Sequence, residues 1–359
     1  MAIEVDFIGT PDVKDDYDAI AFRILDNGRV VNCVFDGGTS VVGEALVEHL
    51  RTYYGRTAGM LPKIDYAFCS HGDRDHSAGL VTLLKLVKVD NIIINFPWDV
   101  IDELYERRKN RCLTKVGLLK RLKENYPELA EIDDIIKAKK INRISGFVED
   151  FCVAGFALLS PKRKFYVDKV AESDKSPDMI VEAADEAFHG PGEEGWAPAE
   201  KYKDYLRDEV ATTPENETSL VLYAEGGGNP ILLAGDAGVE SLECAVQVAG
   251  DLGVDFGRLQ IVQVPHHGGR HNVTSNILDE ILGPVQFVQE KDYKWAFVSV
   301  GNGSDHPKRC VTNAFWNRGW NVYVSSKGSL HGVKGSGFPK RNWESQAPIG
   351  FSSKVEKWD

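Results

Sequence analysis

The chain has 359 residues, of which 43% are hydrophobic and 27% charged, a profile typical of a soluble globular protein with a sizeable core. No apolar run approaches the roughly 20 residues that a membrane-spanning helix needs, so we expect no membrane insertion. The formal net charge of −12 argues against a broad basic surface for non-specific nucleic-acid binding, but it does not exclude a nuclease with a local basic groove.

The N-terminus and the cysteines favour a cytoplasmic protein. The opening residues, MAIEVDFIGT, contain neither the basic segment nor the apolar segment of a secretory signal. The six cysteines form no CxxC pair, which favours reduced thiols over a disulfide framework. We therefore expect a cytoplasmic location.

The first 97 residues alternate between strand and helix patterns. Runs of β-branched and apolar residues bounded by Gly and Asp predict strands, and an apolar stripe with helical period predicts the first helix. In chain order we expect strands at 3–10, 19–25 and 29–38, a helix at 42–55, a strand at 64–70, a helix at 78–87 and a strand at 91–96.

A change of composition then interrupts the alternation. Residues 98–145 are rich in charge and in helix formers and predict a helical insertion, with a break at Pro127. After a strand at 151–161, residues 171–217 are acidic and punctuated by Gly and Pro. Such a composition is typical of a surface excursion.

From Thr218 the alternation resumes. We expect strands at 218–226, 230–236, 260–265, 295–301 and 321–326, with helices at 239–248 and 273–282. Many short strands interrupted by helices predict a mixed α/β fold in which two mixed sheets are flanked by helices. We interpret 1–359 as a single domain whose loops at the strand ends carry the chemistry.

The densest group of chemically active side chains lies in the segment SHGDRDH. It offers four potential ligands within six residues, between a predicted strand and a predicted helix: His71, Asp73, Asp75 and His76. Buried without partners, such side chains would each cost on the order of a few kcal/mol, so they cannot all be ordinary core residues. Imidazole and carboxylate together are ligands of divalent cations.

Three later segments supply the same residue types after predicted strands. Asp236 follows ILLAG, His266 and His267 follow QIVQVP, and His306 follows WAFVSVG and a short loop. Each signal alone is weak, because a lone Asp after a strand is more often a cap or turn residue. Together with the first motif they predict one convergent metal site.

The run SHGDRDHSAGL resembles the HxHxDH signature of the metallo-β-lactamase superfamily in an HxDxDH variant. It is similar to the hydrolase domain of the DNA-uptake channel protein ComEC. The similarity covers about residues 3–97 and 150–335 and continues in order through FDGG, LLSPKRKFY, NETSLVL, LLAGDAG, VPHHGG and SVGNGSDHP. It implies an αβ/βα sandwich with a dinuclear metal centre at one edge, and hydrolysis of phosphodiester or other ester-type bonds.

The resemblance also implies roles for single residues. His71 and Asp73 would bind one metal ion, Asp75 and His76 would bind the other, and Asp236 would bridge the two.

Further roles follow from the later matching segments. One or both of His266 and His267 would complete the second metal position or touch the substrate, which makes His267 a candidate catalytic residue as well. Asp36 would be a structural acid beneath the site.

The chain departs from the family pattern at two places. Asp73 stands where most of the superfamily has a second His, and the usual third His is missing from NETSLVL, where Asn216 and Ser219 stand instead. The only other His in that interval is His189, inside the acidic excursion. Because carboxylate is a harder ligand than imidazole, we expect Mn²⁺ to support catalysis better than Zn²⁺.

Two metal ions about 3.5–4 Å apart would lower the pKa of a bridging water and clamp the attacking and leaving oxygens. Asp75 would ligate and orient the resulting hydroxide, and His306 would protonate the leaving group. The favoured function is therefore that of a metal-dependent phosphodiesterase or nuclease, with nucleic acid or another phosphodiester as substrate.

Two alternatives remain at this stage. One is an esterase for small molecules, such as a lactonase or a phosphorylcholine-type esterase, which the net charge of −12 suits slightly better. The other is a partner-binding effector subunit of a larger assembly, such as a defence system, that recruits a protein through 98–145.

Overall fold

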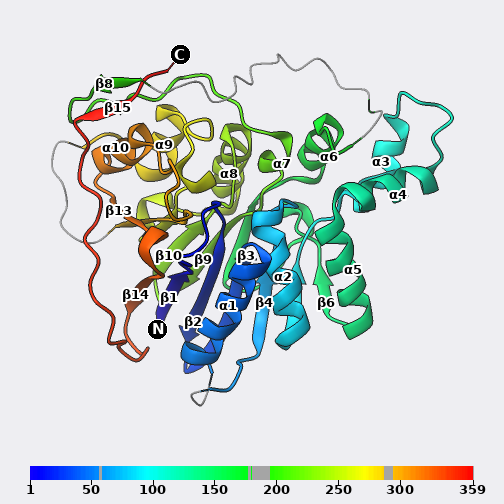
Figure 1. Ribbon diagram of the computed structural model, residues 1–359, viewed down its shortest axis with the longest axis horizontal. Helices are drawn as coiled ribbons and strands as arrows, with labels where there is room; N and C mark the ends of the chain where they lie inside the picture. Colours follow the sequence, from blue (N-terminus) through cyan, green and yellow to red (C-terminus); the bar gives the residue numbers. More distant parts are fainter. Residues whose placement is uncertain (56–58, 177–178, 180–194, 287–293, 359) are drawn as a thin grey trace.

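The computed structural model describes residues 1–359 apart from 56–58, 177–178, 180–194, 287–293 and 359. Two β-sheets pack face to face, and helices cover the outer face of each sheet (Figure 1). This four-layer αβ/βα arrangement confirms the fold class that the sequence predicts.

The first sheet contains seven strands. Its antiparallel half is formed by β14, β1, β2 and β3, and its parallel half continues from β3 to β6. In sheet order the strands are β14 (Leu330–Gly335), β1 (Ala2–Phe7), β2 (Ala19–Asp26), β3 (Arg29–Gly37), β4 (Ile64–Phe68), β5 (Val89–Ile93) and β6 (Asn142–Ile144). The helices α1 (Ser40–Tyr53), α2 (Arg74–Leu86) and α5 (Pro127–Lys139) cover its outer face.

The second sheet contains six strands, of which the four from β13 to β10 are parallel. In sheet order they are β13 (Asn321–Val324), β12 (Trp295–Val298), β11 (Ile261–Gln263), β10 (Asn229–Leu233), β9 (Val221–Gly226) and β7 (Phe156–Ser160). The helices α8 (Val239–Leu252), α9 (Ser275–Leu282) and α10 (Arg309–Asn317) cover it. A small separate sheet pairs β15 (Lys354–Glu356) with β8 (Trp196–Pro198).

Three apolar layers hold the sandwich together. The layer between the sheets is rich in aromatic rings, such as Phe22, Phe35, Phe68 and Phe297. One further layer lies under the helices of each sheet. Short 3-10 helices occur in the connections: η1 (Pro97–Val100), η2 (Val148–Asp150), η3 (Phe256–Arg258), η4 (His266–Gly268) and η5 (Ser325–Lys327).

The predicted helical insertion has two parts. Helices α3 (Ile101–Glu106) and α4 (Lys115–Asn125) form a small apolar core with α6 (Arg163–Glu172), away from the sheets. In contrast, α5 packs on the first sheet, and β6 pairs with β5 as an edge strand. The helical prediction is therefore wrong for the end of 98–145, because a three-residue strand is too short to show a period of two.

The acidic excursion begins within α6 and ends in α7 (Pro214–Glu217). Its residues 177–178 and 180–194, which include His189, lie outside the described part. Within the described residues, no helix is both long and apolar enough to cross a bilayer.

Candidate metal centre

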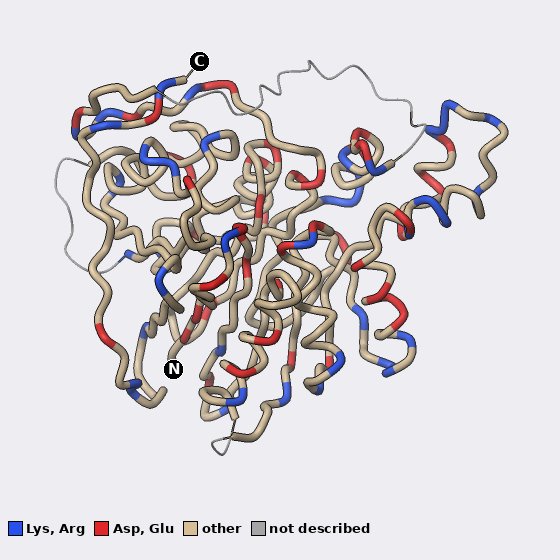
Figure 2. Tube along the Cα trace, in the orientation of Figure 1, with Lys and Arg blue, Asp and Glu red and all other residues tan. Residues whose placement is uncertain are grey.

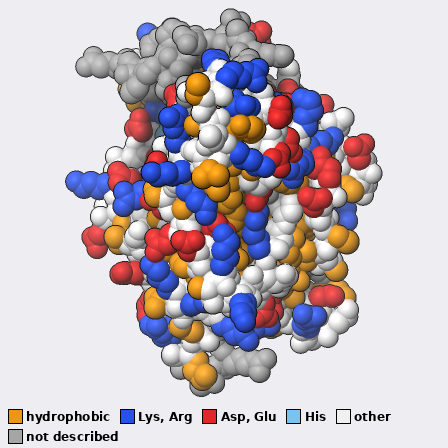
Figure 3. Space-filling view, turned by 90° about the vertical axis from the view of Figure 1, so that its right-hand side faces the viewer, with side chains coloured by type: hydrophobic (Ala, Val, Ile, Leu, Met, Phe, Trp, Pro, Cys, Tyr) orange, Lys and Arg blue, Asp and Glu red, His pale blue; other side chains and the backbone are white. Residues whose placement is uncertain are grey.

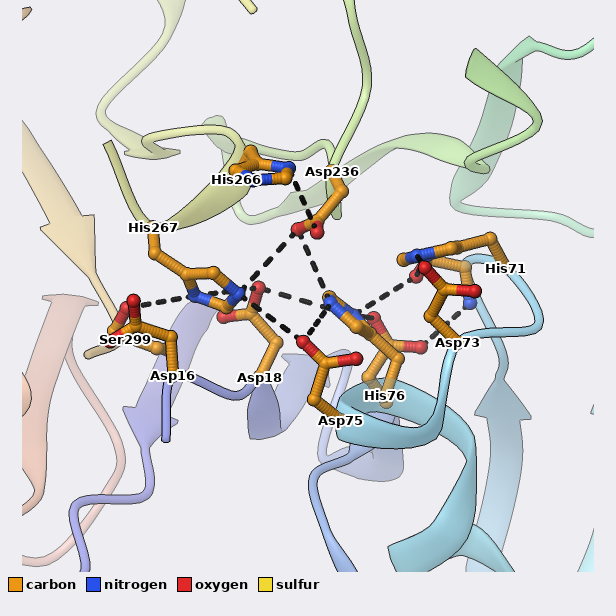
Figure 4. Close-up of polar contacts among 12 residues, drawn as sticks. Asp16, Asp18, His71, Asp73, Asp75, His76, Asp236, His266, His267 and Ser299 are labelled. Carbon is orange, nitrogen blue, oxygen red and sulfur yellow. Dashed lines mark hydrogen bonds and ion pairs between the residues drawn. The ribbon is translucent and has the colours of Figure 1, made fainter. Parts of the chain in front are cut away.

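The SHGDRDH segment links β4 to α2, and α2 begins at Arg74 rather than at the predicted 78. Asp73 is the N-cap residue, so Asp75 and His76 lie in the first helical turn and project toward the edge of the sheets (Figure 4). The helix approaches β3 closely because Gly79 has no side chain. A Cβ at Gly79 would lie 1.8 Å from the carbonyl oxygen of Gly37.

Asp36 at the end of β3 supports this loop from below. Its Oδ1 accepts a hydrogen bond from the backbone N of Ser70 at 2.7 Å, and its Oδ2 lies 2.9 Å from His76 Nδ1. A proton on Nδ1 leaves His76 Nε2 with a lone pair that points into the centre. Carboxylates commonly orient metal-binding histidines in this way. Asp36 thus lies beneath the site, where the family resemblance puts it.

Four predicted residues converge at what we call the second position: Asp75, His76, Asp236 and His267 (Figure 4). His76 Nε2 lies 3.2 Å from Asp236 Oδ1 and 3.7 Å from Asp75 Oδ2. His267 Nε2 lies 3.7 Å from the same Asp75 oxygen and 3.9 Å from Asp236 Oδ1. Since metal–ligand bonds to these atoms measure roughly 2.0–2.2 Å, such separations suit ligands that share one ion.

Several buried polar atoms of this cluster have no hydrogen-bond partner. They are Nε2 of His71, His76 and His267, Oδ1 of Asp236 and both carboxylate oxygens of Asp18. An unsatisfied buried polar group costs on the order of 1–3 kcal/mol, and a buried charge costs more. One divalent cation would satisfy the atoms of Asp18, His76, Asp236 and His267 together, because these four residues offer ligand atoms within 4.8 Å of one another, so the residues present fit a metal ion.

Asp18 also belongs to the cluster, although the sequence did not predict it. Asp18, His76, Asp236 and His267 are all buried, and each offers a ligand atom within 4.8 Å of the others. Asp18 directly precedes β2, which runs antiparallel to β3, with Ala19 paired to Gly37. The start of β2 therefore lies at the same sheet edge as the end of β3, and an acid just before an apolar strand was the available signal.

The protonation of the cluster reflects an excess of carboxylates. Burial lowers the pKa of His267, but Asp236 and Asp18 outweigh burial and raise this pKa to about 10. Burial also disfavours charged His76, yet Asp236 and Asp75 hold its pKa well above the usual value. Burial raises the pKa of Asp18 to about 6 against the opposing effect of His267 and His76. The raised pKa values favour protonated His76 and His267 in the absence of a cation, and a metal ion would displace these protons.

What we call the first position, formed by His71 and Asp73, is built differently. His71 Nε2 lies 3.7 Å from Asp73 Oδ2, and His71 Nδ1 lies 3.0 Å from Ser70 Oγ and 3.3 Å from Ser219 Oγ. The other carboxylate oxygen of Asp73 lies 2.6 Å from Lys175 Nζ. Burial raises the pKa of Asp73, but His71 and Lys175 reverse this effect and leave the pKa far below its usual value.

His266 lies at the rim rather than in the buried cluster. Its Nδ1 is 2.7 Å from Asn216 Nδ2 and 3.1 Å from Asp236 Oδ2, and 30% of its side chain is exposed. Asn216 and Ser219, which stand where the family has a third His, thus contact His266 and His71 respectively. His267 instead contacts the carbonyl oxygen of Ser299 through Nδ1 at 3.0 Å, so its Nε2 faces the centre.

His306 lines the open cleft above the centre. The cleft has a volume of about 720 Å³, and Asp73, Asp75, Asp236, His266 and His267 also line it. His306 Nδ1 lies 2.8 Å from Asp16 Oδ2. The pKa of Asp16 is lowered overall. Burial acts to raise it, but the contact with His306 is among the interactions that outweigh burial. Asp16 is a second residue near the centre that the sequence did not predict.

No protein-family model and no curated protein matches the chain significantly. Solved structures of metallo-β-lactamase-fold proteins are similar to it at low identity. The protein YhfI from Bacillus subtilis is 10% identical, covers 92% of this chain and 100% of its own, and gives a TM-score of 0.43. The metal-dependent hydrolase Tm1679 is 12% identical, with coverages of 92% and 98% and a TM-score of 0.38. Zn²⁺-bound PqqB from Methylobacterium extorquens is 13% identical, with coverages of 92% and 99% and a TM-score of 0.38. Structural similarity at such low sequence identity says nothing about the reaction of this chain.

Proposed function

We propose that the chain is a metal-dependent hydrolase that cleaves phosphodiester bonds. The observation that carries this proposal is the convergence of buried, unpartnered ligand atoms from His76, Asp236 and His267, with Asp75 beside them, on one point below an open cleft. The similarity of SHGDRDHSAGL to the ComEC hydrolase domain supports the same chemistry.

The residues around the cleft have distinct roles in this proposal. Asp75, His76, Asp236 and His267 would hold a divalent ion, Mn²⁺ or Zn²⁺, and His71 and Asp73 would offer a second ion a weaker site. Such ions supply Lewis acidity and make a bound water acidic enough to act near neutral pH. His306 would give a proton to the leaving oxygen, because Asp16 at its Nδ1 leaves Nε2 for proton transfer.

The charge distribution supports a phosphate-bearing substrate. Residues 107–123 contain eight Lys and Arg and no Asp or Glu, although the whole chain has a charge of −12. Figure 2 shows these basic residues along the arm that carries α4, and Figure 3 shows Lys and Arg side chains over this side of the molecule. Lys109 and Arg111 of this arm are exposed. Although Arg107, Lys115 and Lys123 are paired with nearby acids, the arm as a whole offers a basic surface that suits a polyanion.

The experiment uses purified protein stripped by a chelator and reloaded with Mn²⁺, Mg²⁺ or Zn²⁺ in turn. We expect cleavage of single-stranded DNA, double-stranded DNA or RNA oligonucleotides, with little turnover of neutral esters and lactones. Turnover of a lactone or a carboxylic ester, with oligonucleotides left intact, would favour the small-molecule esterase instead. Well-folded protein that binds no metal would leave the partner-binding role as the better interpretation.

A further inference from the structure

Lys175 lies at the first position without any role in the assignments above. It follows the end of α6, and its Nζ lies 2.6 Å from Asp73 Oδ1. Side-chain exposures of 38% for Lys175 and 29% for Asp73 show that the pair borders the cleft rather than being sealed inside it.

The place of Lys175 is fixed by the insertion. Asn125 Nδ2 donates a hydrogen bond to the carbonyl oxygen of Lys175 at 2.7 Å, and Lys175 Nζ lies 5.2 Å from the centre of the Tyr126 ring. Tyr126 in turn packs against Gly72, where a Cβ would lie 2.9 Å from the ring. The α4–α5 corner therefore contacts the metal-binding loop and positions a cation next to it.

This cation changes what the first position can bind. The ammonium group neutralises Asp73, one of only two carboxylates that the family resemblance gives to this position. A divalent ion bound by His71 Nε2 and Asp73 Oδ2 would face a like charge across a single carboxylate. At such short range like charges repel strongly, even where solvent partly screens them.

We propose that Lys175 provides the second positive charge of the centre. One divalent ion is held tightly at the second position, and the Lys175 ammonium group contacts the anionic oxygen of the substrate where a second ion would otherwise act. This inference rests on the proposed function for the identity of the substrate, but its consequence for metal binding does not. It also explains how the site functions without the third His: Lys175 supplies the charge that a fully liganded first ion would bring.

The test compares Lys175→Met with Lys175→Arg and with the control Lys164→Met. Lys164 is a suitable control because it forms an ion pair of equal length, 2.6 Å with Asp168, and its own side chain is 86% exposed. Stripped protein is titrated with Mn²⁺ by calorimetry, and inorganic phosphate is then titrated into the loaded protein. KM and kcat are measured with bis(p-nitrophenyl) phosphate, and the residual turnover of the neutral ester p-nitrophenyl acetate is measured for comparison.

We expect the unmodified chain to bind one Mn²⁺ tightly and a second at least about tenfold more weakly, a difference of 1.4 kcal/mol. Lys175→Met should strengthen the second Mn²⁺ site, weaken phosphate binding and raise KM for the phosphodiester alone. Lys175→Arg should retain phosphate binding, and Lys164→Met should change nothing. Two equally tight Mn²⁺ sites, unaltered in Lys175→Met, would overturn the proposal. Failure to cleave any phosphodiester would instead count against the proposed function, because the metal titration is read separately.

Discussion

The two metal positions have similar sequence signals but different surroundings. At the second position, two buried histidines are each oriented through Nδ1, by Asp36 and by the carbonyl oxygen of Ser299, and neither Nε2 has a hydrogen-bond partner. At the first position, Asp73 is partly exposed and already paired with Lys175. The contrast shows that the two halves of a symmetric-looking HxDxDH motif can acquire different surroundings, because residues outside the motif decide which ligand atoms are left without a partner.

The largest effect is expected from Asp236→Asn, because Asp236 contacts His76 of the complete position and His266 at the rim. Removing a direct ligand should weaken Mn²⁺ binding by more than about 100-fold, beyond the usual loss for a supporting group. Elemental analysis and oligonucleotide cleavage measure the two consequences. Asp251→Asn, an exposed acid on α8, is the control. If Asp236→Asn retained its full metal content, Asp236 would not be a ligand and the assigned metal centre would be wrong.

The second prediction separates the two positions directly. His76→Ala should abolish tight Mn²⁺ binding, whereas His71→Ala should leave the tight ion within about tenfold of its original affinity, since a direct ligand matters more than an outer residue. Calorimetric titration of both variants checks this. Equal losses in the two variants would mean that the positions are not distinct.

The third prediction concerns Asp18, the buried carboxylate without a hydrogen-bond partner. Asp18→Asn keeps the shape but removes the charge of one cluster member, and we expect Mn²⁺ binding to weaken by at least about 10–100-fold. Asp16→Asn should instead reduce turnover with little change in metal affinity, because Asp16 contacts His306. The reverse pattern would exchange the roles of the two acids.

The fourth prediction tests ligand hardness at the first position. Asp73→His replaces an oxygen ligand by a nitrogen ligand and releases Lys175, so Zn²⁺ affinity there should rise by about tenfold, or 1.4 kcal/mol. In the unmodified chain we expect Mn²⁺ to support the fastest cleavage. Highest activity with Zn²⁺, and indifference to Mn²⁺, would refute the hardness argument.

The sequence was enough to predict those residues of the centre whose positions depend on their neighbours along the chain. Asp75 and His76 could be predicted because ligand types were concentrated at a strand-to-helix turn, and His267 because it follows a buried strand. Asp18, Asp16 and Lys175 could not, since each reaches the centre through long-range packing. The first two depend on which end of β2 meets the end of β3, and Lys175 depends on contacts with the insertion.

The smallest effect on either position is expected from Glu217→Gln, which tests whether the scaffold itself creates the asymmetry. Glu217 ends the helix that carries Asn216, and it accepts a hydrogen bond from Ser241 N at 2.8 Å. Burial raises its pKa from 4.5 to about 7, although the contact with Ser241 opposes this. The folded state therefore holds this proton more tightly than the unfolded state does. The resulting destabilisation is absent below about pH 4.5, grows between pH 4.5 and 7, and is complete above pH 7.

Glu217→Gln keeps an acceptor oxygen and removes the charge, so the free energy of unfolding should rise at pH 8 by about 2–3 kcal/mol and change little at pH 4.5. Urea unfolding of the metal-free protein at both pH values measures the difference. Because Glu217 does not contact the ligands, the Mn²⁺ affinities of both positions should stay as they are. If the variant were no more stable at pH 8, the pKa of the Glu217 carboxyl group would not be raised in the folded state. A variant that altered the ratio of the two Mn²⁺ affinities would assign the asymmetry to the scaffold rather than to Lys175.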